Sequence, residues 1–149
     1  MNRLLVAAVM LGSFVGLIQA RSATSDPPVD VPSLLGKTRA QISSVFPGKS
    51  NEIQGWRGWR QVRLDFNDKG RLAAITFTPK APLSEAEATS ILKDRFKIQL
   101  QQSAYVAAPA AHAWRNMTGP IRTINLFKAD GPGYRVSDIS IFYNIGYSQ

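Results

Sequence analysis

Two tryptophans and three arginines stand within nine residues and form the densest group of side chains able to bind a ligand. The stretch reads Gly55-Trp56-Arg57-Gly58-Trp59-Arg60-Gln61-Val62-Arg63. Trp and Arg dominate the hot spots of protein interfaces, and Arg beside Trp also suits sugar-ring stacking or a phosphate-bearing ligand. We therefore predict a binding site whose residues are Trp56, Arg57, Trp59, Arg60 and Arg63.

The exposure of Trp59 depends on the phase of the strand that follows it. Apolar and polar residues alternate over positions 61–66, and an unbroken alternation would place Trp59 on the outer face with Arg63. A bulge at Gly58 would reverse that phase. In this second interpretation the tryptophans complete the core, and the arginine stems lie over them.

The single histidine, His112, lies in an alanine-rich stretch with no acidic residue within ten positions on either side. A general base needs an orienting carboxylate and a metal site needs further ligands, which only distant segments could supply. We therefore expect His112 to be a structural or surface residue.

Catalytic motifs are absent elsewhere. The chain has no cysteine, no G-x-S-x-G turn and no phosphate-binding glycine loop, and its carboxylates are scattered over separate elements. We predict a non-enzymatic protein with no catalytic residues, no metal site and no cofactor. An enzyme with an unrecognised site is the alternative.

Length and composition favour one folded domain. The 149 residues are 44% hydrophobic and 19% charged, and 18 Lys and Arg against 10 Asp and Glu give a net charge of +8. Such a charge attracts anionic polymers and lipid surfaces, or merely aids solubility. The basic residues are dispersed with no run of four, which makes nucleic acid an unlikely partner.

The N-terminus has the pattern of a secretory signal. Arg3 precedes an almost wholly apolar run over 4–18, and Ala20 offers a cleavage position. The run is short for a membrane-spanning helix, which needs about 20 residues. We predict a signal peptide at 1–20, a flexible proline-rich leader at 21–33 and a domain at 34–149. The protein would then be exported, periplasmic or extracellular, with no transmembrane segment after cleavage; an uncleaved anchor is the alternative.

Two capping boxes predict two helices. Thr38 with Gln41, and Ser84 with Glu87, have the T/S-x-x-Q/E spacing of helix N-termini. A hairpin should follow each helix: strands at 61–66 and 73–77 about a turn at 67–70, then strands at 122–128 and 135–143 about a turn at 130–133. We expect additional strands around 52–56 and 112–117, and an irregular segment over 98–112.

The order of helix and hairpin therefore occurs twice, in pseudo-repeats over about 34–80 and 81–149. Joining the halves would bury the apolar face of each. We predict an α+β, two-layer fold, with two helices packed on one antiparallel sheet of four to six strands. In the last strand Ile139, Ile141 and Tyr143 should face inward and Val136, Asp138, Ser140 and Phe142 outward.

The opening Leu35-Gly36-Lys37-Thr38-Arg39-Ala40-Gln41-Ile42 is similar to the G-x-[ST]-[RK]-x-[EQ]-[VI] start of known tandem repeats. With the pattern over 34–145, the chain resembles the beta-lactamase-inhibitor-protein-like fold and the assembly lipoproteins of the SmpA/OmlA type. The resemblance implies that fold and a binding role, and transfers no site residues. The chain lacks the disulfides of the inhibitors and the lipidated cysteine of the lipoproteins. The string Val31-Pro32-x-x-x-Gly36-Lys37-Thr38 also resembles the start of a PASTA repeat, a cell-wall-binding module, but the rest of that repeat does not follow.

Together these patterns predict an exported binding protein. It would bind an envelope protein, or an anionic polymer or lipid surface, through the face of its sheet. An inhibitor or chaperone-like partner of a secreted enzyme is the alternative.

Overall fold

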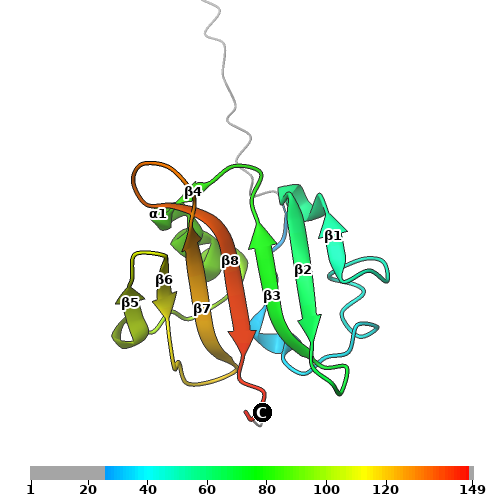
Figure 1. The fold of residues 1–149 in the computed structure, drawn as a ribbon. Coiled ribbons are helices and arrows are strands. Elements are labelled where there is room, and N and C mark those ends of the chain that lie inside the picture. The colour runs from blue at the N-terminus through cyan, green and yellow to red at the C-terminus, as the bar shows by residue number, and fades with distance from the viewer. Residues whose placement is uncertain (1–25, 148–149) are drawn as a thin grey trace, which may run out of the picture.

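The structure, a computed structural model, describes residues 26–147 and consists mainly of one antiparallel sheet of eight strands (Figure 1). The strand order is β1-β2-β3-β8-β7-β6-β5, and β4 pairs with β8 outside this path. The strand bounds are β1 Glu52–Gln54, β2 Gln61–Phe66, β3 Leu72–Thr78, β4 Leu83–Ser84, β5 Tyr105–Ala107, β6 Ala111–Trp114, β7 Ile121–Lys128 and β8 Arg135–Tyr143. The predicted signal peptide at 1–20 lies outside the described residues.

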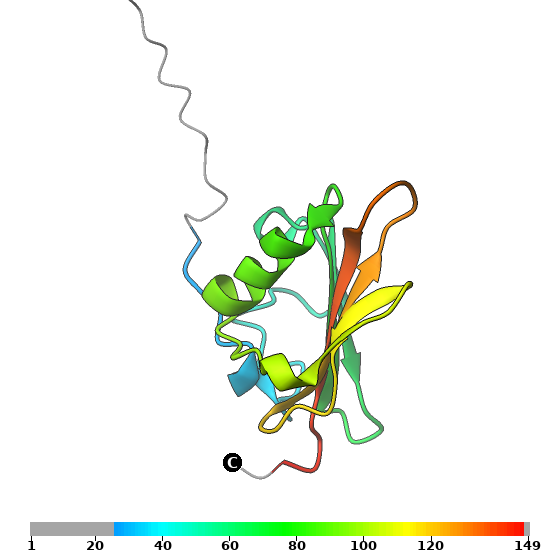
Figure 2. The same cartoon turned by 90° about the vertical axis from the view of Figure 1, so that its left-hand side faces the viewer.

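One face of this sheet is covered and the other is bare. Figure 2 shows the sheet edge-on, with helix α1 (Glu85–Ser90) and the N-terminal part of the chain on one side only. The core fills the covered side, where the Phe77 and Phe96 rings stack with centroids 4.4 Å apart. We call the uncovered side the bare face.

The first hairpin is confirmed. β2 and β3 pair in a register that sets Val62 opposite Phe77 and Leu64 opposite Ile75. All four side chains are buried, as their alternation with polar neighbours predicts. Gly70 takes a φ of +68° in the turn, a conformation that disfavours a side chain.

The predicted fold class is wrong, because the structure has one short helix where two were expected. The chain is mostly β, and its sheet has eight strands instead of four to six. The helix-plus-hairpin order is therefore not repeated. Only the second capping box starts a helix.

The first capping box forms its hydrogen bonds without a helix. The Thr38 amide donates to Gln41 Oε1 at 2.9 Å, and the Gln41 amide donates to Thr38 Oγ1 at 3.3 Å. The following residues form successive turns with mixed i+3 and i+4 bonds, and the Ser43 hydroxyl donates back to the Ala40 carbonyl at 2.8 Å. Serines favour such local bonds over helix, and β-branched residues lose side-chain freedom in a helix. Burial of the apolar residues Ile42 and Phe46 therefore holds the segment instead.

The second capping box is confirmed. Ser84 accepts from the Glu87 amide, and the Glu87 side chain accepts from the Ser84 amide at 2.7 Å. These bonds hold the pKa of Glu87 below its usual value. After α1 the coil widens into a π-helical segment, Ile91–Arg95, so the helical stretch spans about three turns.

Short elements complete the described chain. The 3₁₀ turns are η1 at Pro32–Leu34, η2 at Trp56–Gly58 and η4 at Gln102–Ala104. The last of these and β5 lie in the segment expected to be irregular.

The proline-rich leader is ordered from its described beginning, which corrects the expectation that order starts near Leu34. Val29 and Val31 are buried, and their amides donate to the Arg95 carbonyl at 2.8 Å and the Phe96 carbonyl at 3.2 Å. The Tyr143 hydroxyl donates to the Val31 carbonyl at 2.7 Å. Burial raises the pKa of this phenol well above its usual value.

The last strand carries a bulge that the sequence pattern did not show. Ile139, Ile141 and Tyr143 face inward as predicted, but Val136 is also fully buried instead of outward. The register of β7 and β8 shifts between Phe127 and Lys128, because Phe127 pairs with Asp138 and Lys128 with Val136. The extra residue in β8 turns Val136 back to the covered side.

Within residues 26–147, no helix is long and apolar enough to cross a membrane.

Candidate functional site

The two tryptophans of the predicted site belong to the core. Trp56 is 8% exposed and Trp59 is 4% exposed, which contradicts the interpretation that placed Trp59 on an outer face. Trp56 Nε1 donates to the Val45 carbonyl at 2.8 Å, and the Trp59 ring stacks on Phe96 at 6.0 Å. The tryptophans complete the core as in the second interpretation, but the cause is the 3₁₀ turn η2, with Arg57 at a φ of +47° and Gly58 at +85°, and not a bulge within the strand.

The three arginines of that group are dispersed. Arg57 lies over the Trp56 ring, 5.0 Å from its centroid, and donates to the Pro27 carbonyl at 2.5 Å. Arg60, the residue just before β2, is exposed. Arg63 lies on the bare face, where it forms an ion pair with Asp65 at 3.3 Å. Only Arg63 therefore reaches the sheet face through which binding was predicted.

Small polar side chains line the middle of the bare face. On β3 and β8 they are joined in pairs: Thr76 to Ser140 at 2.9 Å, and the Thr78 hydroxyl to Asp138 at 2.6 Å. Neighbouring side chains leave Thr78 and Ser140 only 8% and 5% exposed, so these two mainly fix the sheet surface. The bare face also presents three apolar side chains, with 36% of Phe142, 39% of Phe127 and 42% of Val106 exposed. A flat sheet surface with fixed polar groups and scattered apolar groups is suited to contact with another protein.

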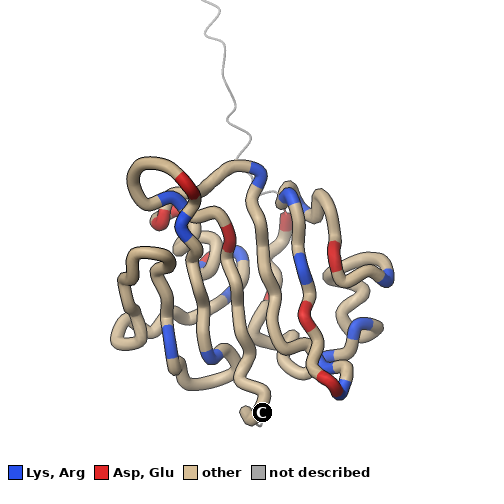
Figure 3. Tube along the Cα trace, in the orientation of Figure 1, with Lys and Arg blue, Asp and Glu red and all other residues tan. Residues whose placement is uncertain are grey.

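The charges of the bare face nearly balance. Strand register puts Glu52, Arg63 and Asp65 on this side near the β1 edge of the sheet. It puts Asp138 on the same side, on the central strand β8. Arg122 joins Arg63 and Phe142 around a hollow of about 540 Å³. Figure 3, in the orientation of Figure 1, shows few charges along the central strands β3 and β8. The net charge of +8 therefore does not come from this surface.

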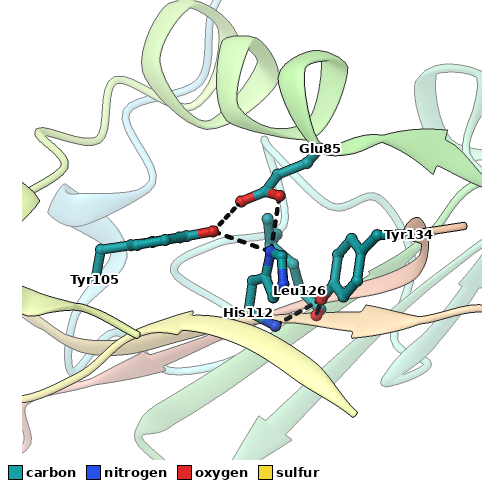
Figure 4. Close-up of polar contacts among 5 residues, drawn as sticks. All are labelled: Glu85, Tyr105, His112, Leu126 and Tyr134. Atoms are coloured by element: carbon teal, nitrogen blue, oxygen red, sulfur yellow. Dashed lines mark hydrogen bonds and ion pairs between the residues drawn. The ribbon is translucent and has the colours of Figure 1, made fainter. Parts of the chain in front are cut away.

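A second candidate is a hydrogen-bonded cluster on the covered side, which we call the His112 cluster: Glu85, Tyr105, His112 and Tyr134 (Figure 4). His112 Nδ1 lies 2.7 Å from Glu85 Oε2 and 2.9 Å from the Tyr105 hydroxyl. The Tyr105 hydroxyl donates to Glu85 Oε1. Glu85 is the first residue of α1, so the cluster joins the helix N-terminus to the edge strand β5 and its neighbour β6.

Tyr134 completes the cluster from the loop between β7 and β8. Its ring stacks on the His112 imidazole with centroids 3.6 Å apart and an interplanar angle of 11°. Its hydroxyl accepts from the His112 amide at 2.5 Å and donates to the Leu126 carbonyl. Burial raises the pKa of Tyr134, and burial with the bond to Glu85 raises the pKa of Tyr105 to about 12. Both phenols therefore stay protonated at neutral pH.

The Glu85 carboxylate orients the imidazole as the carboxylate of a catalytic dyad would. Glu85 lines an open hollow of about 520 Å³ along α1 together with Lys93 and Asp94, but His112 does not line it, so the imidazole does not face that space. Among residues 26–147 no three His, Asp or Glu side chains gather to hold a metal ion. The geometry thus suits a structural role in bracing α1 against the sheet edge.

The sequence contained only part of the signal for this cluster. The expectation that distant segments would have to supply the acid for His112 was correct, because Glu85 is 27 residues away. The capping box at Ser84 places Glu85 in a first helical turn, but the local pattern does not say which strand that turn faces.

Comparisons with protein-family models, with curated proteins and with solved structures found no match to this chain.

Proposed function

We propose that the protein is an exported, non-catalytic binding protein that docks a partner protein on the bare face of its sheet. The bare face itself carries this proposal, since helix and N-terminal segment cover only the opposite side (Figure 2). Export rests on the signal pattern at 1–20, and a non-catalytic role on the absence of a recognised catalytic motif in the sequence.

The balance of charge on the bare face favours a protein over an anionic polymer or lipid surface. A polyanion needs a concentration of positive charge, and here Arg63 and Arg122 are offset by Glu52, Asp65 and Asp138. A protein partner can instead cover Phe142 and Phe127 and pair with the polar groups around them. We propose an inhibitor or chaperone-like complex with a secreted enzyme as the alternative identity of that partner.

The decisive experiment compares two acidic substitutions in capture from a native envelope extract. Phe142→Glu places a charge in the middle of the bare face. Ala86→Glu places the same charge on the exposed side of α1 and serves as the matched control. Each protein is used as bait at low salt and again at about 0.3 M salt, where attraction between distant charges is screened.

We expect one protein to be retained at the higher salt by the unmodified chain and by A86E. The Kd of that protein for F142E should be at least tenfold higher than its Kd for the unmodified chain. Equal retention by A86E and F142E would refute the docking face. Capture of polyanions alone, lost at the higher salt, would assign binding to the general positive charge instead.

A further inference from the structure

We infer that a cavity remote from the bare face is a binding site for short apolar peptides with free termini. This cavity, which we call the terminal cavity, has a volume of about 810 Å³. It lies between the N-terminal segment that includes η1, the chain after the π-helical segment, and the loop from β6 to β7. Its volume is in the range of pockets that hold drug-sized ligands, to which a dipeptide corresponds.

Hydrogen bonds brace each wall of the terminal cavity. The Gln101 amide donates to the Thr118 carbonyl at 2.9 Å and accepts from the Thr118 amide at 3.1 Å, which joins two walls. The Asn144 amide donates to the Pro120 carbonyl at 2.8 Å. The N-terminal wall is held by the bonds of Val29 and Val31 to the helical segment. The cavity is therefore formed before a ligand arrives, which lowers the cost of binding.

Two of the three non-glycine residues with positive φ lie at this cavity. Lys97, at +57°, is part of its lining, and Asn116, at +54°, precedes the lining residue Met117. A non-glycine residue in this conformation costs about 1 kcal/mol or more and persists only where its surroundings hold it. The contacts around Lys97 and Asn116 therefore hold both segments in place against this cost.

The lining combines apolar groups with two opposite charges. Ile98, Met117 and Ile121 form a buried floor, each less than 5% exposed. Asp30 and Lys97 are exposed on the same wall, since the amide of Val31 pairs with the carbonyl of Phe96 beside them. Within the described part of the chain neither charged group forms an ion pair. One oxygen of the Asp30 carboxylate accepts from the Ser33 amide at 3.2 Å, and the other is left to face a ligand.

A ligand that satisfies this lining carries an ammonium for Asp30, a carboxylate for Lys97 and an apolar side chain for the floor. Gln99 adds an exposed side-chain amide that can pair with a peptide group. A short peptide with both termini free has all of these groups. The hollow around Arg63, Asp65 and Phe142 also places opposite charges beside an apolar group, but there the two charges pair with each other. This inference goes beyond the proposed function and does not depend on it.

Met117 provides a direct readout, because it lines the cavity and the only other methionines are Met1 and Met10. The full chain is labelled with ¹³C at the methionine methyl groups, and the Met117 signal is assigned with Met117→Leu. The dipeptide Leu-Phe is then added up to about 10 mM, ten times a millimolar Kd. Its N-acetylated and C-amidated forms are the chemical controls.

We expect the Met117 methyl to shift with saturation on addition of Leu-Phe. Asp30→Asn and Lys97→Gln should each weaken binding at least fivefold, and blocking the corresponding terminus should have the same effect. Lys93→Gln, an exposed lysine outside the cavity, is the matched control and should bind like the unmodified chain.

An unmoved Met117 signal at the highest concentration would overturn the inference. So would a blocked peptide that binds as well as Leu-Phe, or unchanged affinity in either D30N or K97Q. Phe142→Glu should leave peptide binding intact. The experiments therefore test peptide binding in the terminal cavity and partner docking on the bare face separately.

Discussion

Removal of the Glu85 side chain tests whether the His112 cluster contributes to stability. Glu85→Ala deletes an acceptor that receives one hydrogen bond from Tyr105 and one from His112. A hydrogen bond to a charged group contributes about 1.5–3 kcal/mol. Loss of two such bonds would lower the free energy of unfolding by about 3–6 kcal/mol if both donors were left unpaired.

Two features of the cluster reduce that figure. Tyr105 and His112 already lie 2.9 Å apart and can pair with each other once Glu85 is gone. The Glu85 side chain is also 32% exposed, so water replaces part of its bonding. We therefore expect a loss of about 2 kcal/mol in the free energy of unfolding, with a fall in Tm of roughly 6–10 °C for a domain of this size.

Urea unfolding at pH 7, followed by fluorescence of the buried tryptophans, measures this loss. Glu85→Gln keeps the shape of the side chain and one acceptor oxygen, so its loss in the free energy of unfolding should be about half that of Glu85→Ala. Glu52→Ala removes an exposed glutamate of β1 and should change stability by less than about 0.5 kcal/mol. If E85A is no less stable than E52A, the cluster does not brace α1 and the argument from its geometry fails.

Three further predictions concern other groups of the fold. The absorbance of the Tyr105 phenol should titrate near pH 12. Because its pKa is raised by folding, its contribution to stability is constant below pH 10 and is lost as the pH rises from about 10 to 12. A Tyr105→Phe variant that leaves the alkaline titration of the protein unchanged would contradict this. Ser84→Ala should cost about 1 kcal/mol in chemical unfolding, and an unchanged stability would show that the Ser84 hydroxyl does not cap α1. The pKa of Glu87 measured by NMR should rise only in part, because the backbone amide of residue 84, the larger cause of its lowering, is kept. Phe77→Ala removes a fully buried ring between Trp59 and Phe96 and should cost about 3–5 kcal/mol in urea unfolding, whereas a loss below 1 kcal/mol would mean that the core collapses around the gap.

The sequence predicted well those elements whose signals are local. Alternation over 61–66 identified β2 and its buried side, and the Ser84 box identified α1. The Thr38 box was misleading because its two side-chain bonds form equally well at a single turn. A helix needs further residues that favour it, and the serines and Val45 that follow Thr38 do not.

The candidate sites depended on information that the sequence does not contain locally. The phase of Trp59 was decided by the 3₁₀ turn η2, and the inward turn of Val136 by a bulge. The pairing of His112 with Glu85, and the meeting of three distant segments at the terminal cavity, follow from the order of strands in the sheet. No spacing along the chain specifies that order.

The position of β8 has a consequence for how the protein acquires its structure. β8 follows every other strand of the described chain, yet it lies between β3 and β7 and also pairs with β4. Before it is made, β1–β3 and β5–β7 are two separate ribbons with exposed apolar faces. Emerging chains should therefore stay unfolded, and open to chaperones or a translocation channel, until β8 has been made and has left the ribosome.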